Sequence, residues 1–343
     1  MSWTEVRNLL CVRLDSIGDV LMTTPAIRAC RETFGCRVTL LTSSTGAAAG
    51  KHVPEVVDIL TFAAPWMKVA RPGSDAALME ELRKRNFDAA VIFTVYSQSP
   101  LPAAYVCYLA GIARRLAHCH ENPYHLLSDW VLDPEPTARV RHEVQRQLEL
   151  VAAVGARTAD ERLSFSVPTW ARERVRRLMA PLRGPAVVVH VGASAASRRY
   201  PPQQYAQAVD LLVERTGCDA IFTGDADEQA LVQSVRDAMA QPSHSLVGRL
   251  ELAELAALIA QADLLISNNT APAHIAAAVD TPVVDLYALT NPQHTPWLVK
   301  SRVLFHDVPC RNCYKSVCPA GHHDCLKRVP PERVAEAAQE LLA

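Results

Sequence analysis

Short apolar runs alternate with stretches of helical periodicity along most of this chain, and this alternation limits the possible folds more than any other feature. The runs are continuously apolar, which is typical of strands buried on both faces of a parallel sheet. The expected strands are residues 9–14, 37–42, 57–62, 89–95, 186–191, 219–223, 263–267 and 282–287. Helices are expected at 21–34, 77–85, 142–154, 169–179, 203–216, 227–239, 251–262, 271–279 and 331–342. Strands separated by helices predict an α/β fold with doubly wound sheets.

The alternation stops in the middle of the chain and then restarts. Residues 120–139 contain three prolines and are expected to form a connecting loop, and proline and glycine recur at 181–185. At 343 residues the chain can form two domains of about 100–200 residues each. We expect an N-terminal domain at 1–175 and a C-terminal domain at 176–343, both Rossmann-like and facing each other across a cleft. Ligands of such sheets bind at the carboxyl ends of the strands.

The charge balance and the hydropathy pattern exclude several classes of protein. The formal net charge is −1, so the chain lacks the basic excess expected of a protein that binds duplex nucleic acid. No apolar stretch reaches the roughly 18 residues that a membrane-spanning helix needs. The first residues lack the basic region, apolar stretch and cleavage site of a signal peptide. We therefore expect a cytoplasmic protein, for which peripheral contact with a membrane stays open.

The first candidate site is the loop Asp15-Ser16-Ile17-Gly18-Asp19, between the first strand and the first helix. Gly18 allows a tight turn and the close approach of a ligand, so it is a candidate binding residue. Asp19 lies near the start of the helix, where a carboxylate can act as general base and take a proton from an attacking hydroxyl. The alternative is that Asp15 and Asp19 only cap the helix. The G-x-G-x-x-G pattern of dinucleotide sites is absent from this loop.

The second candidate is the small-residue loop 191–201, which follows a buried strand. Its glycine at position 192, its hydroxyl at Ser194 and the charge of Arg198 or Arg199 suit a phosphate group close to a helix N-terminus. The alternative is an exposed loop with two solvated arginines.

Two further strand ends carry polar residues. In 223–228, a carboxylate can face the hydroxyls of a ribose, as acidic residues at such strand ends do. The alternative is a helix cap, with Asp225 or Asp227 as the capping residue and Glu228 in the first turn. In 267–274, small polar residues precede a helix with proline in its first turn, a pattern that suits both an N-cap and an anion site. His274 lies on that first turn and is either structural or a ligand contact.

Four of the ten cysteines lie close together near the end of the chain, at Cys310, Cys313, Cys318 and Cys325. In a reducing cytoplasm such a cluster favours a metal over disulfides, and four thiolates can close a tetrahedral zinc or iron site. An ion with four protein ligands has no open position, so its role would be structural. The alternative is a loop with four reduced thiols.

In their order along the chain, three motifs resemble glycosyltransferase family 9, the ADP-heptose heptosyltransferase family. They are D-S-I-G-D followed by L-M-T-T-P, then G-A-S-x-x-S-R-R-Y-P, and then S-N-N-T-A-P-A-H-I-A-A-A-V-D-T-P-V-V. The resemblance implies a GT-B fold, with the acceptor on the N-terminal domain and the nucleotide-sugar on the C-terminal domain. It also implies that no metal is required for catalysis. Terminal cysteine sets similar to this one occur in some members, including heptosyltransferases that modify autotransporter proteins, where iron has been implicated.

By position, the resemblance gives Asp19 the role of catalytic base. It implies that Ser194 and Arg198 meet the donor phosphates and that Glu228 contacts the nucleotide. The Asp-Thr-Gly-x-x-His element of the family, at the donor pyrophosphate and sugar, corresponds to Asn269, Thr270 and His274. Here arginine stands at the usual lysine, and Asn269 and Ala271 replace an aspartate and a glycine. These departures leave the donor sugar undetermined.

The implied reaction is inverting transfer of a heptose from ADP-heptose to a hydroxyl of a lipopolysaccharide core, another glycan or a protein. Positive groups at the leaving pyrophosphate stabilise the charge that develops there. Two other functions stay open. One is a sugar-nucleotide epimerase of the same fold, and the other is a non-catalytic, metal-linked assembly protein.

Overall fold

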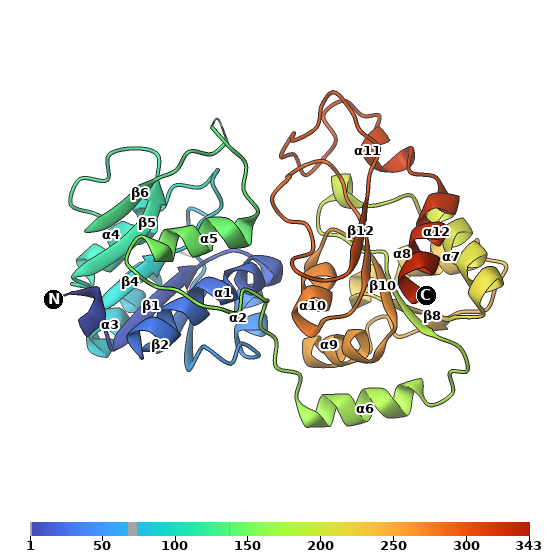
Figure 1. The fold of residues 1–343 in the computed structure, drawn as a ribbon, viewed down its shortest axis with the longest axis horizontal. Coiled ribbons are helices and arrows are strands. Elements are labelled where there is room, and N and C mark those ends of the chain that lie inside the picture. The colour runs from blue at the N-terminus through green and yellow to red at the C-terminus, as the bar shows by residue number, and fades with distance from the viewer. Residues whose placement is uncertain (1, 68–73, 137) are drawn as a thin grey trace. The chain divides into compact units, whose positions relative to one another are not determined.

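The computed structural model describes residues 2–67, 74–136 and 138–343, and the chain divides into two compact units between Ser166 and Val167 (Figure 1). The boundary precedes the one expected at 175/176, which would have split helix α6 (Thr169–Met179). This helix packs on α9 (Leu252–Gln261) of the second unit, where Arg174 Nε lies 2.9 Å from Glu254 Oε1. The whole of α6 therefore belongs to the second unit.

The first unit is built on six parallel strands in the order β3-β2-β1-β4-β5-β6. Their bounds are β1 (Asn8–Arg13), β2 (Arg37–Thr42), β3 (Asp58–Thr61), β4 (Ala89–Ile92), β5 (Arg114–Cys119) and β6 (Asp129–Leu132). The helices are α1 (Ile17–Phe34), α2 (Ser44–Gly50), α3 (Ser74–Arg85), α4 (Leu101–Leu109) and α5 (Glu143–Ala152). Strand order reverses direction between β1 and β4, and in open α/β sheets ligands bind beyond the carboxyl ends of such a pair.

The second unit repeats this topology with the order β12-β11-β10-β7-β8-β9, again all parallel. Its strands are β7 (Ala186–His190), β8 (Asp219–Thr223), β9 (His244–Ser245), β10 (Leu264–Asn268), β11 (Val283–Leu286) and β12 (Ser301–Leu304). Besides α6 and α9, its helices are α7 (Pro202–Thr216), α8 (Gln229–Asp237), α10 (Ala271–Val279), α11 (Asp324–Lys327) and α12 (Pro331–Leu342), with short 3₁₀ turns at η2 (Ala196–Arg198) and η3 (Ala226–Glu228). The reversal of strand order here lies between β7 and β10.

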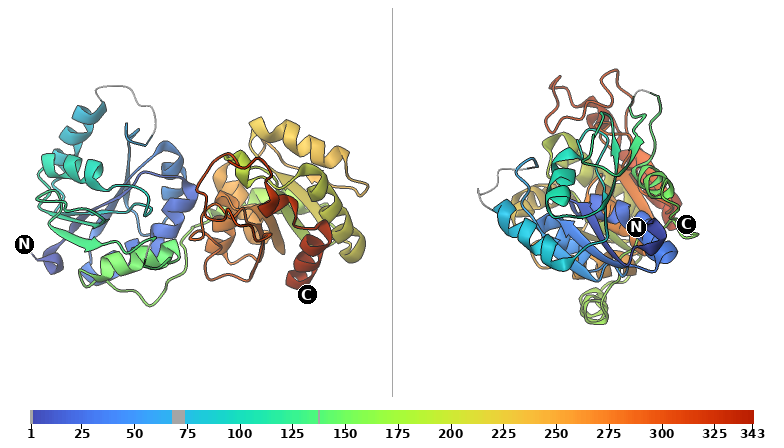
Figure 2. Two further views of the ribbon diagram at one scale, coloured as in Figure 1. Left: turned by 90° about the horizontal axis from the view of Figure 1, so that it is seen from above. Right: turned by 90° about the vertical axis from the view of Figure 1, so that its left-hand side faces the viewer.

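Helices lie on both sides of each sheet (Figure 2), and each unit has its own apolar core. The predicted doubly wound α/β fold is therefore confirmed. The last helix, α12, packs on α7 and places Val334, Ala335 and Ala338 in the core of the second unit with no exposed surface. Among the described residues, no helix has the length and apolar character needed to cross a membrane.

Some elements depart from the sequence-based expectation. The connecting loop expected at 120–139 contains β6, an edge strand on which Trp130 and Leu132 are exposed and alternate with less exposed neighbours. Half-exposed edge strands lack the continuous apolar run by which the other strands were identified. Helix α1 begins at Ile17, before the expected residue 21, so that Gly18 and Asp19 lie within its first turn.

Candidate active site

In the first unit, the start of α1 holds Asp19 in two ways. Ser16 is the N-cap residue and Asp19 is the third helical residue. Asp19 Oδ2 accepts hydrogen bonds from the Ser16 backbone N–H at 3.1 Å and from the Ser16 hydroxyl at 2.6 Å. Its other oxygen, Oδ1, lies 3.1 Å from Nη2 of Arg13, and 15% of the side chain is exposed. Asp19 thus both takes part in the helix cap and keeps a partly accessible carboxylate.

Arg13, the last residue of β1, is completely buried and contacts three carboxylates. Its guanidinium lies 3.0 Å from Asp15, 3.1 Å from Asp19 and 2.8 Å from Glu143. Burial lowers the pKa of Arg13, but the three carboxylates more than offset this effect, so the net change is upward and the group stays charged. A single cation therefore fixes the loop before α1.

Asp15 lies beside Asp19 and lines a cavity of about 280 Å³ in the first unit. Burial raises the pKa of Asp15 to about 6, against the lowering effect of Arg13, and the charge of Asp19 raises it further. The Asp15 carboxylate accepts a hydrogen bond of 2.7 Å from the side-chain amide of Gln98. The cavity is lined by Val12, Leu14, Asp15, Trp66, Met67, Ile92, Phe93, Thr94, Ser97, Gln98, Ser99, Pro102 and Ala103, which places it at the carboxyl ends of β1 and β4.

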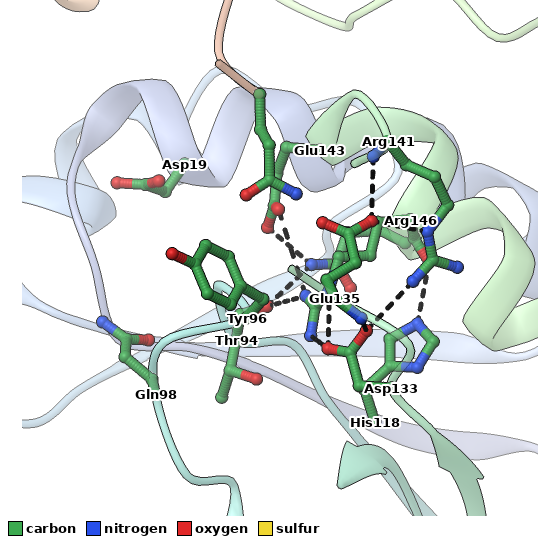
Figure 3. A network of polar contacts seen from close by, with 12 residues as sticks. Asp19, Thr94, Tyr96, Gln98, His118, Asp133, Glu135, Arg141, Glu143 and Arg146 are labelled. Atoms are coloured by element: carbon green, nitrogen blue, oxygen red, sulfur yellow. Dashed lines mark hydrogen bonds and ion pairs between the residues drawn. The ribbon is translucent and has the colours of Figure 1, made fainter. Parts of the chain in front are cut away.

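Glu143, at the start of α5, connects this loop to a buried polar network (Figure 3). Its Oε1 accepts the bond from Arg13 and a second, 2.6 Å long, from the amide of Gln147. Gln147 also donates to the backbone carbonyl of Thr94, which lies just after β4. The side chain of Glu143 has no exposed surface, so its charge is compensated within the protein.

The same network continues from α5 to the segment that follows β6 (Figure 3). Arg146 lies 2.5 Å from Asp133, and Arg141 bridges Asp133 at 3.0 Å and Glu135 at 2.7 Å. The pKa of His118 is lowered to about 4 by burial and by the charge of Arg146, so this imidazole is neutral. The sequence analysis identified none of these partners, because each pairs with residues distant in the chain.

In the second unit, the two candidate arginines of the loop after β7 differ in their contacts. The Nε of Arg199 donates a 2.8 Å hydrogen bond to the carbonyl of Ala193. The side chain of Arg198, in η2, makes no hydrogen bond or ion pair with the residues that the structure describes. Burial raises the pKa of Tyr287 and the charge of Asp285 raises it further, while Arg198 and a hydrogen bond from Asn269 lower it. Ser194 is exposed on the same loop.

Gly192 and Glu228 lie in contact at the ends of β7 and β8. A Cβ atom at position 192 would lie 1.8 Å from Oε1 of Glu228, so any larger residue would displace this carboxylate. The Glu228 carboxylate also accepts a 3.0 Å bond from the backbone N–H of Asp225 and caps η3. Burial raises the pKa of Glu228. Both alternatives for this carboxylate, cap and ligand contact, are compatible with this position.

The end of β10 connects with the loop after β7 through Asn268. Its side chain accepts from the Tyr200 backbone N–H at 3.0 Å and donates to the Val191 carbonyl at 2.9 Å. The next residues are Asn269, 7% exposed, and Thr270, the N-cap of α10. His274 is 4% exposed on the first turn of α10. The second unit thus collects Gly192, Ser194, Arg198, Glu228, Asn269, Thr270 and His274 at the carboxyl ends of three adjacent strands, whereas Gly18 and Asp19 belong to the first unit.

The structure does not form the predicted set of four cysteine ligands. Among the residues with described positions, no three His, Cys, Asp or Glu side chains are gathered as metal ligands. Cys310 is exposed and its Sγ lies 3.6 Å from His322 Nε2, whereas Cys325 is partly buried in α11. Burial raises the pKa of Cys325, and the thiols of the other three raise it further, so the four share one neighbourhood. A metal there stays a prediction, and no chemical step is derived through it.

Known proteins resemble this chain over nearly its full length. Lipopolysaccharide heptosyltransferase 1 of Pseudomonas aeruginosa is 26% identical, covering 97% of this chain and 98% of that protein. The crystal structure of a family 9 glycosyl transferase from Veillonella parvula has a TM-score of 0.82 at 19% identity, covering 100% of this chain and 98% of that one. ADP-heptose lipopolysaccharide heptosyltransferase II of Escherichia coli has a TM-score of 0.76 at 23% identity, with 98% of each chain covered. These structures confirm the GT-B fold.

A family comparison covers most of the chain. The sequence model described as glycosyltransferase family 9 (heptosyltransferase) matches residues 76–323, which include the loops after β7, β8 and β10. Because the match spans most of the chain, the chain belongs to glycosyltransferase family 9 and is a sugar-transferring enzyme.

Proposed function

We propose that this enzyme transfers a heptose from ADP-heptose, with inversion, to a hydroxyl of a lipopolysaccharide core. The observation that carries the proposal is the guanidinium of Arg198, which has no partner among the described residues of the second unit, combined with Asp19 at the start of α1 in the first. Arg198 supplies a cation for the diphosphate of the donor, and Asp19 supplies a carboxylate that can take the proton of the acceptor hydroxyl. The names of the relatives, which are lipopolysaccharide heptosyltransferases, support the choice of sugar and acceptor.

In this reaction the acceptor oxygen attacks the anomeric carbon of the heptose as the bond from that carbon to the diphosphate oxygen breaks. The hydroxyl proton passes to Asp19, and the bonding pair leaves with ADP. Negative charge grows on the leaving diphosphate, where Arg198 and the N-terminus of α10 stabilise it. Buried Arg13 holds the Asp19 carboxylate in place, so the base is oriented before the acceptor arrives.

The cavity beside Asp15 is the acceptor subsite in this proposal. Trp66 offers an aromatic face for a sugar ring, and Ser97, Gln98 and Ser99 offer hydroxyl and amide groups for sugar hydroxyls. The described residues that line the cavity include one carboxylate and no cation. This favours an uncharged, hydroxyl-bearing part of the acceptor over a phosphate or carboxylate.

A binding screen with ADP-, GDP-, UDP- and dTDP-sugars tests the donor. We expect ADP-heptose to bind most tightly and to be turned over only when acceptor is added, with inverted anomeric configuration in the product by NMR. Release of free sugar or of its epimer without acceptor would identify an epimerase instead. Absence of binding to all four donor classes would favour a non-catalytic protein.

A further inference from the structure

The proposed reaction gives no role to the cysteine-rich segment 310–325. This segment lies against the loop that carries Arg198. The segment precedes and enters α11, far along the chain from η2 (Figure 1). Three hydrogen bonds join it to one residue of η2, Ser197. This residue directly precedes Arg198 and is 4% exposed.

All three polar groups of Ser197 are bound by this segment. Its backbone N–H donates to the Ser316 carbonyl at 3.1 Å. Its hydroxyl donates to the Lys315 carbonyl at 2.8 Å. Its own carbonyl accepts a 2.5 Å bond from Nε2 of His323, which fixes the proton of that imidazole on Nε2. Ser197 is therefore held by residues more than a hundred positions later in the sequence.

The same segment also holds the loop that follows β11. The backbone N–H groups of Asn312 and Tyr314 donate to the carbonyls of Leu289 and Thr290, at 2.6 and 2.9 Å. Close to these carbonyls in sequence is Tyr287, whose pKa both Arg198 and Asn269 lower. One segment thus holds both the backbone directly before Arg198 and the loop that follows Tyr287.

We propose that Ser197 and His323 are positioning residues for the donor diphosphate: they hold η2 so that the guanidinium of Arg198 is directed at the phosphates before the donor binds. The inference rests on the proposed role of Arg198. It does not require the thiols to bind a metal, because the contacts to Ser197 come from His323 and from backbone carbonyls. Preorganising a charged group in this way increases affinity by lowering the cost of ordering it on binding.

The test measures the affinity of the full-length protein for ADP by calorimetry. We expect Ser197→Ala and His323→Ala each to weaken ADP binding about 3- to 10-fold, the range for loss of one hydrogen bond. His323→Gln, whose side-chain amide can donate at a reach similar to that of Nε2, should recover most of the affinity. Ser316→Ala is the matched control: it removes a hydroxyl from the same segment and leaves the carbonyl bond to Ser197, so ADP binding should not change.

A double-mutant cycle with Arg198→Ala separates positioning from general loosening. If His323 acts through Arg198, His323→Ala should add little to the loss already caused by Arg198→Ala. Full additivity, or failure of His323→Gln to recover affinity while the protein stays folded, would overturn the positioning role. An Arg198→Ala variant that binds ADP as tightly as the wild type would instead refute the donor site on which this inference rests.

Discussion

At the scale of single residues, the start of α1 is dominated by an imbalance of charge. Three carboxylates, those of Asp15, Asp19 and Glu143, contact the one guanidinium of Arg13. Glu143 is fully buried and lies 3.9 Å from a second cation, Arg146, so the imbalance falls on the two aspartates. They differ in environment, since Asp15 has its pKa raised by burial whereas Asp19 is held by the N-cap residue. Two carboxylates in different environments can divide the tasks of binding and proton transfer.

Replacing Asp19 with Asn should remove the general base and leave the fold intact. The side-chain oxygen of asparagine can still accept the hydrogen bonds that Asp19 takes from the N-cap residue Ser16, so the start of α1 should persist. Loss of a general base lowers rates by about 10²–10⁴. We expect a fall of kcat in that range with unchanged affinity for ADP, measured by a transfer assay and by calorimetry. A kcat close to that of the wild type would exclude Asp19 as the base.

Arg198 and Arg199 should differ in their effect on the donor. Only Arg198 has its guanidinium free of partners among the described residues, whereas Arg199 is bonded to the backbone of Ala193. A hydrogen bond to a charged group contributes about 1.5–3 kcal/mol, so Arg198→Ala should weaken ADP binding about 10- to 150-fold. Arg199→Ala serves as the comparison. If its effect were the larger, the phosphate contact would belong to Arg199.

Sequence reasoning located the candidate residues but not their supports. The loops around Asp19 and Arg198 follow apolar strands and carry recognisable polar residues, so local pattern was enough to find them. Arg13 and Glu143 lie 130 positions apart, and nothing local indicates that they meet. The clue available was an arginine at the end of an apolar strand, a position that burial would forbid without partners.

At the scale of elements, β11 carries an acidic residue at a fully buried position. Asp285 is fully buried, and neither carboxylate oxygen has a hydrogen-bond partner among the described residues. Burial raises the pKa of Asp285 well above its usual value. Its charge would in turn disfavour ionisation of Tyr205 and Tyr287. A buried carboxyl group without a partner at such a strand position makes the stability of the fold depend on pH.

Asp285→Asn should therefore change how stability depends on pH. The carboxyl group of the unfolded chain titrates near 3.9, as aspartate usually does, so above that pH the folded state holds a proton that the unfolded state has lost. The wild-type protein should lose stability relative to the variant by about 1.4 kcal/mol per pH unit from there up to the folded pKa. Urea denaturation between pH 4 and 8 measures this. Asp280→Asn, at an exposed position, is the control and should follow the wild type.

The cysteine-rich segment leads to a prediction about the metal content of the protein. We expect protein purified without chelators to contain near-stoichiometric zinc or iron by elemental analysis, because four thiolates can close a tetrahedral site for such ions. The double variant Cys310→Ser, Cys313→Ser should lose the metal. Metal-free wild-type protein with four titratable thiols and unchanged stability would show that the segment is a reduced loop.

At the scale of the whole molecule, both units use one strand order, and most of it followed from the sequence. Apart from the edge strand β3, the strands found in advance lie inside each sheet, where burial on both faces leaves a continuous apolar run. The strands not found, β5, β6, β9 and β12, lie toward the margins, and β9 has only two residues. Strand order itself depends on pairing between distant segments, which propensity and periodicity do not encode.

The division into two units predicts which backbone segments a bound nucleotide protects from hydrogen exchange. All candidate donor residues except Gly18 belong to the second unit. Hydrogen exchange measured by mass spectrometry with and without ADP should show protection at 190–199, 267–274 and 287–294, since bound ligand suppresses local opening. Backbone amides of the first unit outside the loop at 15–19 should be unaffected. Protection confined to the loop at 15–19 would place the nucleotide on the wrong unit in our proposal.

The packing of α12 has a consequence for how the protein is made. The first unit is complete at Ser166, so it can fold while the rest of the chain is still being synthesised. The second unit needs α12 to close its core, and α12 rests on α7, the helix that follows the phosphate loop. A stop codon just before Pro331 would leave every candidate donor residue translated and still yield a unit that cannot bury its core. On the ribosome, the first unit is thus finished early, and the second unit is completed only when the last helix emerges.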